Sequence, residues 1–344
     1  MLFRRKTGLI SKLRKAFGSK TTLLRRVEAQ AAQAAGLGLS THLHLMDFSE
    51  RSLLLAGRTA AWQLPRNRKI KNLSEVEFRV FSQWGEDGII DWLVSHVAVP
   101  NTRFVEVGVE TFREANCRFL LMNRNWKGLV LDGDETNMAA LRNERLHWMY
   151  DLTARAAFVT TENIDELITR EEFGGPLGIL SIDIDGNDYW VWKAIKSVNP
   201  AIVICEYNPI LGDTHAISVP YDPNFRRFNA HFSGLFFGCS IEALRQLAKQ
   251  RGYTFVGSNS NGINAFFVRN DLAEPVLAKL EDARAFASRH RDSRNADGQM
   301  SYAGGLARFE LIRHLDVVDV SNGQHVRLAE IKQPYSEQWL QEMN

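Results

Sequence analysis

Apolar runs alternate with helix-like segments along most of the chain. Short runs rich in β-branched residues and leucine predict strands at 103–109, 127–134, 156–161, 177–185, 201–208, 253–259 and 264–269. Apolar residues at helical spacing predict helices at 80–97, 115–125, 135–146, 164–173, 188–198 and 240–252. Nearly continuous apolar strands separated by helices are typical of a parallel sheet that is covered on both faces. We therefore predict an α/β fold in which the last helix and two strands add an antiparallel element.

The segments on either side of this alternation predict three regions. Residues 1–70 form a basic helical extension and linker, residues 71–270 the α/β domain, and residues 271–344 a C-terminal extension with a helix at 274–291. Within residues 1–27, nine basic side chains and no acid surround an apolar helical face. This pattern fits a helix on an anionic membrane surface, a helix packed on its own domain, a solvated tail, or an organelle transit peptide.

Composition narrows the classes of function. The 344 residues carry a net charge of +2, but the 317 residues after the basic segment hold 33 basic and 40 acidic side chains. Their net charge of −7 argues against nucleic acid as a partner of the main body. No run of 18 apolar residues predicts a membrane span, and Cys117, Cys205 and Cys239 form no close pair. We predict a cytoplasmic protein, with residues 1–27 as the segment that would rest on the inner membrane face.

Acidic residues follow several of the predicted strands. They are Glu106, Asp132, Asp134, Asp183, Asp185 and Glu206. In open parallel sheets, ligands bind beyond the carboxyl ends of the strands, so these acids mark a candidate site. The stretch GILSIDIDGNDYW at 178–190 fits three kinds of protein: a phosphatase with an aspartyl nucleophile, a metal-dependent glycosyltransferase using Asp183 and Asp185, or a methyltransferase. The phosphatase is disfavoured because the stretch falls on about the fourth strand of the domain.

The turn after the first strand and the acid after the second favour a nucleotide-like cofactor. Gly108 lets the backbone approach such a cofactor, and Glu106 stands two residues before it. An acid that ends the second strand can accept both ribose hydroxyls, a role that suits Asp132 and, as a substitute, Asp134.

Short motifs in a fixed order then suggest a family. They are SQWGED at 82–87, VEVGV at 105–109, Asn116, NWKG at 125–128, SIDIDGND at 181–188, and Glu206. Together, over residues 78–269, they resemble the FkbM-type methyltransferases. The resemblance implies a Rossmann-like class I methyltransferase sheet, S-adenosylmethionine as cofactor, and a saccharide or polysaccharide-precursor hydroxyl as methyl acceptor. Glu106, Gly108, Asn116, Asp132 and Asp183 are then the candidate cofactor-binding residues.

Methyl transfer to a sugar hydroxyl needs alignment and help in removing a proton. Asp185, Asp188 and His215 are the candidate catalytic residues, with His231 as a further candidate base; Asp188 could instead cap the helix that follows it. Asp185, Glu206 and Asn208 could hold Mg²⁺. Residues 208–234 form a loop long enough to be a lid, and Arg226 and Arg227 suit a polar acceptor.

The departures from the family pattern keep other functions open. The turn reads GVETFREAN where the family has small residues, Ser181 replaces a lysine, and Asp185 and Asp188 replace glutamates. A binding or assembly subunit that no longer catalyses is therefore one alternative, and the glycosyltransferase is another. The sequence EYNP at 206–209 resembles a motif of methyltransferases that act on nucleic acid bases, but the acidic body disfavours that substrate. The sequence makes no prediction of oligomeric state.

Overall fold

The computed structural model describes residues 45–343, so the predicted amphipathic segment at 1–27 lies outside the described residues. The chain divides into two compact units, residues 1–56 and residues 57–344. The predicted boundary near residue 70 stays a prediction. Within residues 45–343, no helix is both long enough and apolar enough to cross a membrane. All three cysteines are buried and free, which agrees with the expectation that they form no disulfide.

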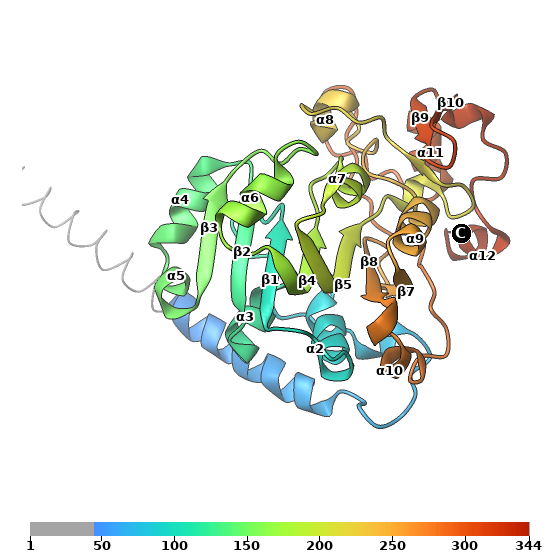
Figure 1. Ribbon diagram of the computed structural model, residues 1–344. Coiled ribbons are helices and arrows are strands. Elements are labelled where there is room, and N and C mark those ends of the chain that lie inside the picture. The colour runs from blue at the N-terminus through green and yellow to red at the C-terminus, as the bar shows by residue number, and fades with distance from the viewer. Residues whose placement is uncertain (1–44, 344) are drawn as a thin grey trace, which may run out of the picture. The chain divides into compact units, whose positions relative to one another are not determined.

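A seven-stranded sheet organises the larger unit (Figure 1). Its strands are β1 (Arg103–Val107), β2 (Lys127–Asp132), β3 (Leu152–Ala156), β4 (Gly175–Ile182), β5 (Val198–Glu206), β7 (Tyr253–Ser258) and β8 (Asn264–Arg269). Their order is β3-β2-β1-β4-β5-β8-β7. Strands β1 to β5 pair in parallel, whereas β8 runs antiparallel to both of its neighbours. The predicted α/β fold with an antiparallel last strand is confirmed.

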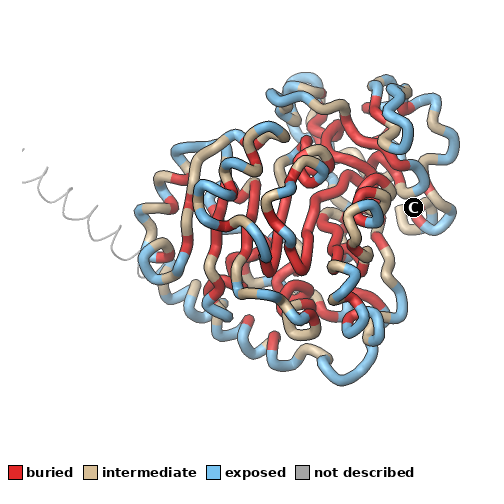
Figure 2. The backbone as a smooth tube through the Cα atoms, in the orientation of Figure 1, coloured by how far each residue is buried: buried red, intermediate tan, exposed pale blue. Residues whose placement is uncertain are grey.

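Helices cover the sheet because its strands are apolar on both faces. Helix α2 (Glu86–His96) precedes the first strand, and the helices between later strands are α3 (Arg118–Arg124), α4 (Glu135–Asn143), α5 (Arg145–Met149), α6 (Ile164–Arg170), α7 (Asp188–Ala194) and α9 (Ile241–Gln250). Val105 and Val107 of β1 pack in one hydrophobic cluster with residues of α6, α7 and α9. Phe104, which alternates with them, is equally buried on the opposite face. Figure 2 shows the central strands as the most continuously buried part of the chain.

The third strand differs from its prediction. Residues 156–161 were expected to form it, but β3 occupies Leu152–Ala156 and the chain leaves the sheet afterwards. The apolar residues that suggested a strand cover the end of the sheet instead, with Val159 buried in the core cluster and Phe158 against Gly133. A loop with one buried valine, Val159, and a half-exposed phenylalanine, Phe158, therefore had the composition of a strand.

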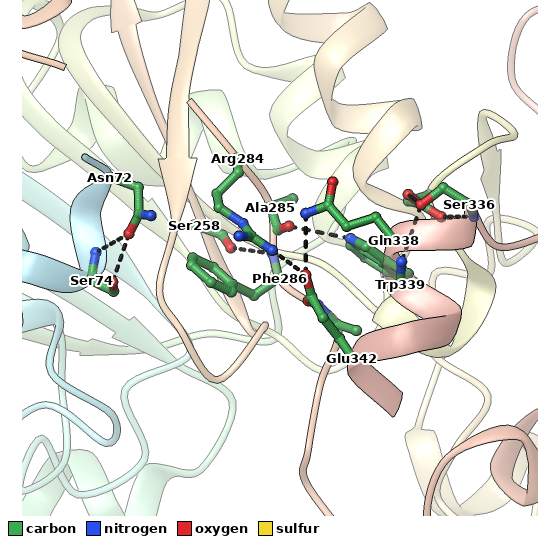
Figure 3. Close-up of polar contacts among 12 residues, drawn as sticks. Asn72, Ser74, Ser258, Arg284, Ala285, Phe286, Ser336, Gln338, Trp339 and Glu342 are labelled. Carbon is green, nitrogen blue, oxygen red and sulfur yellow. Dashed lines mark hydrogen bonds and ion pairs between the residues drawn. The ribbon is translucent and has the colours of Figure 1, made fainter. Parts of the chain in front are cut away.

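The C-terminal extension is also less helical than predicted. The expected helix at 274–291 is reduced to α10 (Glu274–Leu277), because residues 284–286 bind the rest of the fold through their backbone. Ser258 N donates to Arg284 O at 3.0 Å, Phe286 N donates to Ser258 Oγ at 3.1 Å, and Trp339 Nε1 of α12 (Glu337–Met343) donates to Ala285 O at 3.2 Å (Figure 3). These long-range hydrogen bonds replace the local ones of a helix.

A second, three-stranded sheet joins the extension to the long loop after β5. Strands β9 (Asp316–Asp319) and β10 (Gln324–Arg327) form a hairpin, and β9 also pairs with β6 (Ile217–Ser218) from the loop, in the order β10-β9-β6. The loop also contains η2 (Pro209–Leu211) and α8 (Arg227–Ala230), and α11 (Leu306–Ile312) precedes β9. The long loop at residues 208–234 is thus ordered by secondary structure, and its strand β6 pairs with β9 of the C-terminal extension.

The SQWGED motif has a structural role before α2. Asp87 Oδ2 accepts hydrogen bonds from the backbone N–H groups of Val80, Phe81 and Ser82 at 2.7–2.8 Å, and from the Ser82 hydroxyl at 2.9 Å. Residues 80–85 therefore wrap around this carboxylate, and α2 begins only at Glu86, later than predicted. Burial raises the pKa of Asp87 to about 6.

Replacing Asp87 by alanine should lower the free energy of unfolding by about 3 kcal/mol, because buried backbone N–H groups would lose their acceptor. Urea denaturation measures the change. Asp282→Ala is the matched control, since Asp282 is exposed and its backbone N–H, not its carboxylate, makes the hydrogen bond to Lys71. Equal stability of the two variants would contradict this role for Asp87.

Candidate active site at the carboxyl edge of the sheet

The order of the strands reverses between β1 and β4. From β1 the chain builds outward through β2 and β3, and it then returns to place β4 and β5 on the other side. The carboxyl edge at such a switch point is where open α/β sheets bind their ligands. Gly108 follows β1 and Asp183 follows β4, so the predicted cofactor residues occupy this place.

The turn after β1 has three residues with positive φ angles, as a glycine-rich turn would, although only one of the three is glycine. Gly108, Glu110 and Phe112 adopt positive φ angles of 80°, 46° and 59°. Such angles are ordinary for glycine but uncommon for residues with a Cβ. The sequence GVETFRE thus differs in composition from the FkbM-type pattern. Its backbone nevertheless has positive φ angles at every second residue, at 108, 110 and 112, which three glycines would allow.

Gly108 is required by contact as well as by its φ angle. A Cβ at this position would lie 1.6 Å from the carbonyl oxygen of Asp183. The approach is fixed by hydrogen bonds from Gly108 N to Leu131 O at 2.8 Å and from Asp183 N to Val107 O at 3.0 Å. The ends of β1, β2 and β4 are therefore drawn together at this glycine.

Glu106 holds the far end of the turn. Its carboxylate accepts hydrogen bonds from Asn116 N at 2.7 Å and Cys117 N at 3.1 Å, at the start of α3. Burial raises its pKa to about 7 despite these two hydrogen bonds, which favour the charged form. Asn116 Nδ2 donates to Ser181 Oγ of β4 at 3.1 Å. Two of the predicted cofactor residues thus connect the turn to its neighbouring elements.

Asp132 ends β2 beside the same turn. Its Oδ2 accepts from Glu110 N at 2.7 Å, and its Oδ1 accepts from Asp134 N at 2.9 Å. Asp134, the substitute named from the sequence, instead caps α4 by accepting from Thr136 N at 2.7 Å. Each oxygen of a carboxylate can accept a second hydrogen bond, so Asp132 retains acceptor capacity toward a ribose.

Three acids gather at the ends of β4 and β5. One carboxylate oxygen from each of Asp183, Asp188 and Glu206 lies within 4.8 Å of the others. Burial and mutual repulsion raise the pKa of Asp183 and of Glu206 well above their usual values, and burial raises that of Asp188 to about 6. Each of Asp183 and Glu206 therefore disfavours the charged form of the other.

Asp188 organises the turn in which the motif SIDIDGND ends. Its carboxylate accepts from Ile184 N at 2.8 Å and from Gly186 N at 2.9 Å, and the side chain is fully buried. Asp188 is the first residue of α7 and Asn187 stands at the cap position, so the acid closes the turn before the helix. This placement favours the structural interpretation of Asp188 over the catalytic one.

Asp185 faces outward and pairs with the loop. Its carboxylate accepts from Arg227 Nη1 at 2.7 Å, with 53% of the Asp185 side chain and 16% of the Arg227 side chain exposed. Arg227 also donates to Gly234 O and lies over the Phe237 ring at 4.2 Å. Arg227 was expected to meet an acceptor; the structure gives it a partner in the protein.

The loop is fastened over the end of β4 by further contacts. Asn187 Nδ2 donates to Asp222 O at 2.8 Å, and Gly238 N donates to Gly186 O at 3.1 Å. A Cβ on Gly186 would lie 2.2 Å from the Phe225 ring, so this glycine admits the loop to close contact. The loop therefore covers the turn that carries Asp185.

The predicted magnesium ligands are not brought together as a set. Asn208 Nδ2 donates to Leu235 O and Phe237 O, both at 2.9 Å, and Asn208 Oδ1 accepts from Ile210 N at 3.0 Å. Because Asp185 pairs with Arg227, only Glu206 of the three lies in the buried acid cluster. Glu206 Oε2 is buried and has no hydrogen-bond partner among the described residues. A hard cation would therefore meet Asp183, Asp188 and Glu206.

The two candidate histidines lie apart from these acids. His215 is exposed, and its Nδ1 contacts Thr214 Oγ1 at 2.8 Å. His231 Nδ1 contacts Ser233 Oγ at 2.7 Å, and burial lowers its pKa. Neither contact directs the imidazole to Asp183, Asp185 or Glu206.

Glu86 is a site residue that the sequence interpretation did not single out. Its Oε1 accepts from the side-chain amides of Asn259 at 2.7 Å and Asn264 at 3.1 Å, and its Oε2 accepts from Trp84 N at 2.9 Å. Its charge acts on the pKa of Asp183, so it extends the acidic group at the carboxyl edge. The one feature of the sequence that could have identified Glu86 as a site residue was its position in the SQWGED motif.

Comparison with known proteins is informative for fold. No protein-family model matches the chain, and no curated protein matches it. Among solved structures, the N-terminal domain of EvdMO1, in the presence of SAH and D-fucose, is 14% identical over 62% of this chain and 93% of that chain, with a TM-score of 0.36. The fold resembles that of class I methyltransferases.

Two further structures extend the likeness. The O-methyltransferase from Bacillus cereus in complex with SAH is 13% identical over 64% of this chain and 88% of that one, with a TM-score of 0.34. An S-adenosylmethionine-dependent methyltransferase from Clostridium acetobutylicum is 11% identical over 54% and 90%, with a TM-score of 0.33.

Proposed function

We propose that the protein is an S-adenosylmethionine-dependent O-methyltransferase of the FkbM type, acting on a hydroxyl of a saccharide or polysaccharide precursor. The observation that carries the proposal is the turn after β1. It pairs Gly108 with alternating left-handed residues at the switch point of the sheet, and it lies beside Asp132 at the end of β2. This is the arrangement that presents backbone and one acid to a ribose.

The residues of the edge fit such a cofactor by their chemistry. Asp132 has acceptor capacity for ribose hydroxyls, and the acids around Asp183, including Glu206 with its unpartnered buried oxygen, suit the positive charge of a sulfonium or an amino group. When bound, the cofactor supplies an activated methyl group. The role of the protein is to hold the acceptor oxygen in line with the methyl group and to exclude water.

Asp185 is the acid best placed to take the acceptor's proton. It is exposed, whereas Asp188 is buried and engaged by backbone N–H groups. Its ion pair with Arg227 fixes the orientation of the carboxylate while the loop closes over it. We assign Asp185 the role of general base and Arg227 that of a positioning residue.

One observation favours the non-catalytic alternative. Both oxygens of Asp132 and both oxygens of Glu106 already bind backbone N–H groups of the protein itself. A turn sealed by its own acids could persist as a scaffold without a cofactor. The glycosyltransferase alternative has less support, because Asp185 of its Asp183–Asp185 pair faces Arg227.

Calorimetric titration with S-adenosylhomocysteine tests the proposal. We expect micromolar binding by the natural protein and a loss of at least about 100-fold in Asp132→Ala, because the ribose acceptor and the anchor of Glu110 are both removed. Asp134→Ala is the matched control, since Asp134 is the neighbouring acid but caps α4. Absence of binding by the natural protein, with or without Mg²⁺, would overturn the enzyme proposal in favour of the scaffold.

A further inference from the structure

A groove of about 390 Å³ lies outside the buried acid cluster. Trp190 and Lys193 of α7 form one side, and Tyr221 of the long loop adjoins them. Val318 of β9 and His325 of β10 form the other side. The groove therefore exists only where the C-terminal hairpin meets the α/β domain.

The aromatic side chains of the groove are fixed by hydrogen bonds at their polar ends. Trp190 Nε1 donates to Val219 O at 2.9 Å. The Tyr221 hydroxyl donates to Glu162 at 2.6 Å and accepts from Thr161 N at 3.2 Å. The two ring centroids stand 6.3 Å apart. Side chains held in this way lose little rotamer freedom when a ligand binds, so the groove is preorganised.

The lining residues of the groove include two basic side chains, and Glu162 contacts the groove only through the Tyr221 hydroxyl. Lys193 and His325 are its titratable side chains besides Tyr221, and no carboxylate stands among the described residues that line it. The Lys193 ammonium lies 5.4 Å from the centroid of the Trp190 ring, so cationic and aromatic surfaces are adjacent. Both side chains are exposed and can donate hydrogen bonds into the groove.

We propose that this groove binds an anionic saccharide and is the acceptor subsite of the protein. A sugar ring offers C–H faces that pack on aromatic and aliphatic surface such as Trp190, Tyr221 and Val318, while its edge needs hydrogen-bond donors. Lys193 and His325 place those donors where a carboxylate or phosphate on the sugar would be neutralised. The inference rests on the proposed function, whose acceptor it narrows to a charged glycan.

The position of the groove supports this assignment. Trp190 stands two residues after Asp188 in α7, on the helix that starts at the carboxyl edge of the sheet. Pro220 and Tyr221 line the groove, and the next residue, Asp222, accepts a hydrogen bond at its carbonyl from Asn187 Nδ2, in the turn before α7. A glycan seated on Trp190 thus lies beside the turn that carries Asp185.

A surface-bound panel of neutral, uronic-acid-containing and phosphorylated oligosaccharides tests the inference with the full chain. We expect retention on acidic members, reduced at least tenfold in Lys193→Glu and in His325→Ala, with neutral members bound more weakly. Lys249→Glu is the matched control, because Lys249 is an exposed lysine of α9 outside the groove. These surface variants avoid the unfolding that loss of the Trp190 contacts could cause.

Titration with S-adenosylhomocysteine on the same preparations separates this inference from the proposed function. Cofactor binding without retention of any glycan, or glycan retention unchanged in Lys193→Glu and His325→Ala, would overturn the acceptor subsite and leave the methyltransferase proposal in place. Acidic glycan retention that both variants lose, without cofactor binding, would support the groove as a saccharide site and reject the enzyme.

Discussion

Gly108→Ala is expected to lower the free energy of unfolding by about 4 kcal/mol or more, the range reached when a mutation forces backbone apart. The new Cβ would lie 1.6 Å from Asp183 O and 2.7 Å from the Asp183 carbonyl carbon, neither of which can rotate away. Relief requires the ends of β1 and β4 to separate. Thermal unfolding followed by circular dichroism should show a melting temperature lower by about 10 °C.

Gly175→Ala is the control that isolates this contact. Gly175 has a φ angle of 83°, close to the 80° of Gly108, but a Cβ there would meet no atom within 4 Å. The free energy of unfolding of Gly175→Ala should fall by only about 1 kcal/mol, which is the cost of placing an alanine in the left-handed conformation. Equal losses in the two variants would show that backbone conformation alone, and not the approach of β1 to β4, makes glycine necessary at residue 108.

The stability of the protein should fall as the pH rises above about 4, where these carboxyl groups begin to ionise in the unfolded chain, and Asp183→Asn should reduce that fall. Burial and repulsion raise the pKa of Asp183 and Glu206 in the folded state above their values in the unfolded chain. The native state therefore holds protons that the unfolded state releases, and stability is lost between the unfolded and the folded pKa values as pH rises. Each unit of pKa difference corresponds to about 1.4 kcal/mol.

Urea denaturation at pH 5 and pH 8, in the presence of a chelator, measures this difference. Because an amide resembles a protonated carboxyl group but does not titrate, the stability of the variant relative to the natural protein should be higher at pH 8 than at pH 5. Asp282→Asn, at an exposed site, should leave the pH dependence unchanged. Parallel losses of stability in Asp183→Asn and the natural protein would refute a raised pKa of Asp183 in the folded state.

The sheet was predictable because parallel strands are buried on both faces and so appear as continuous apolar runs. The run before Asp183 forms β4, and the run before Glu206 forms β5. The same criterion failed at residues 156–161, where a loop with one buried residue, Val159, has a strand-like composition. It also failed in the C-terminal extension, where hydrogen bonds to distant residues such as Ser258 outweigh helical periodicity.

The location of the candidate site was predictable from the sequence, but the hydrogen-bond and ion-pair partners of its residues were not. The acids at the strand ends follow from where each strand stops, and Gly108 from the turn it must make. The pairing of Arg227 with Asp185 depends on how the long loop folds. The same holds for the hydrogen bonds from the Asn208 amide to the carbonyl oxygens of Leu235 and Phe237. Such contacts join residues far apart in sequence, and no local pattern encodes them.

The pairing of β6 with β9 sets an order of events during synthesis. About 100 residues separate the two strands, so at a typical translation rate the loop over Asp185 must wait about 5–20 s before its sheet partner emerges from the ribosome. The α/β domain can form its parallel strands earlier, since β1 to β5 are complete by Glu206. The loop over Asp185 would lack its sheet partner until β9 is synthesised, which ties the finished site to a segment made about 100 residues later.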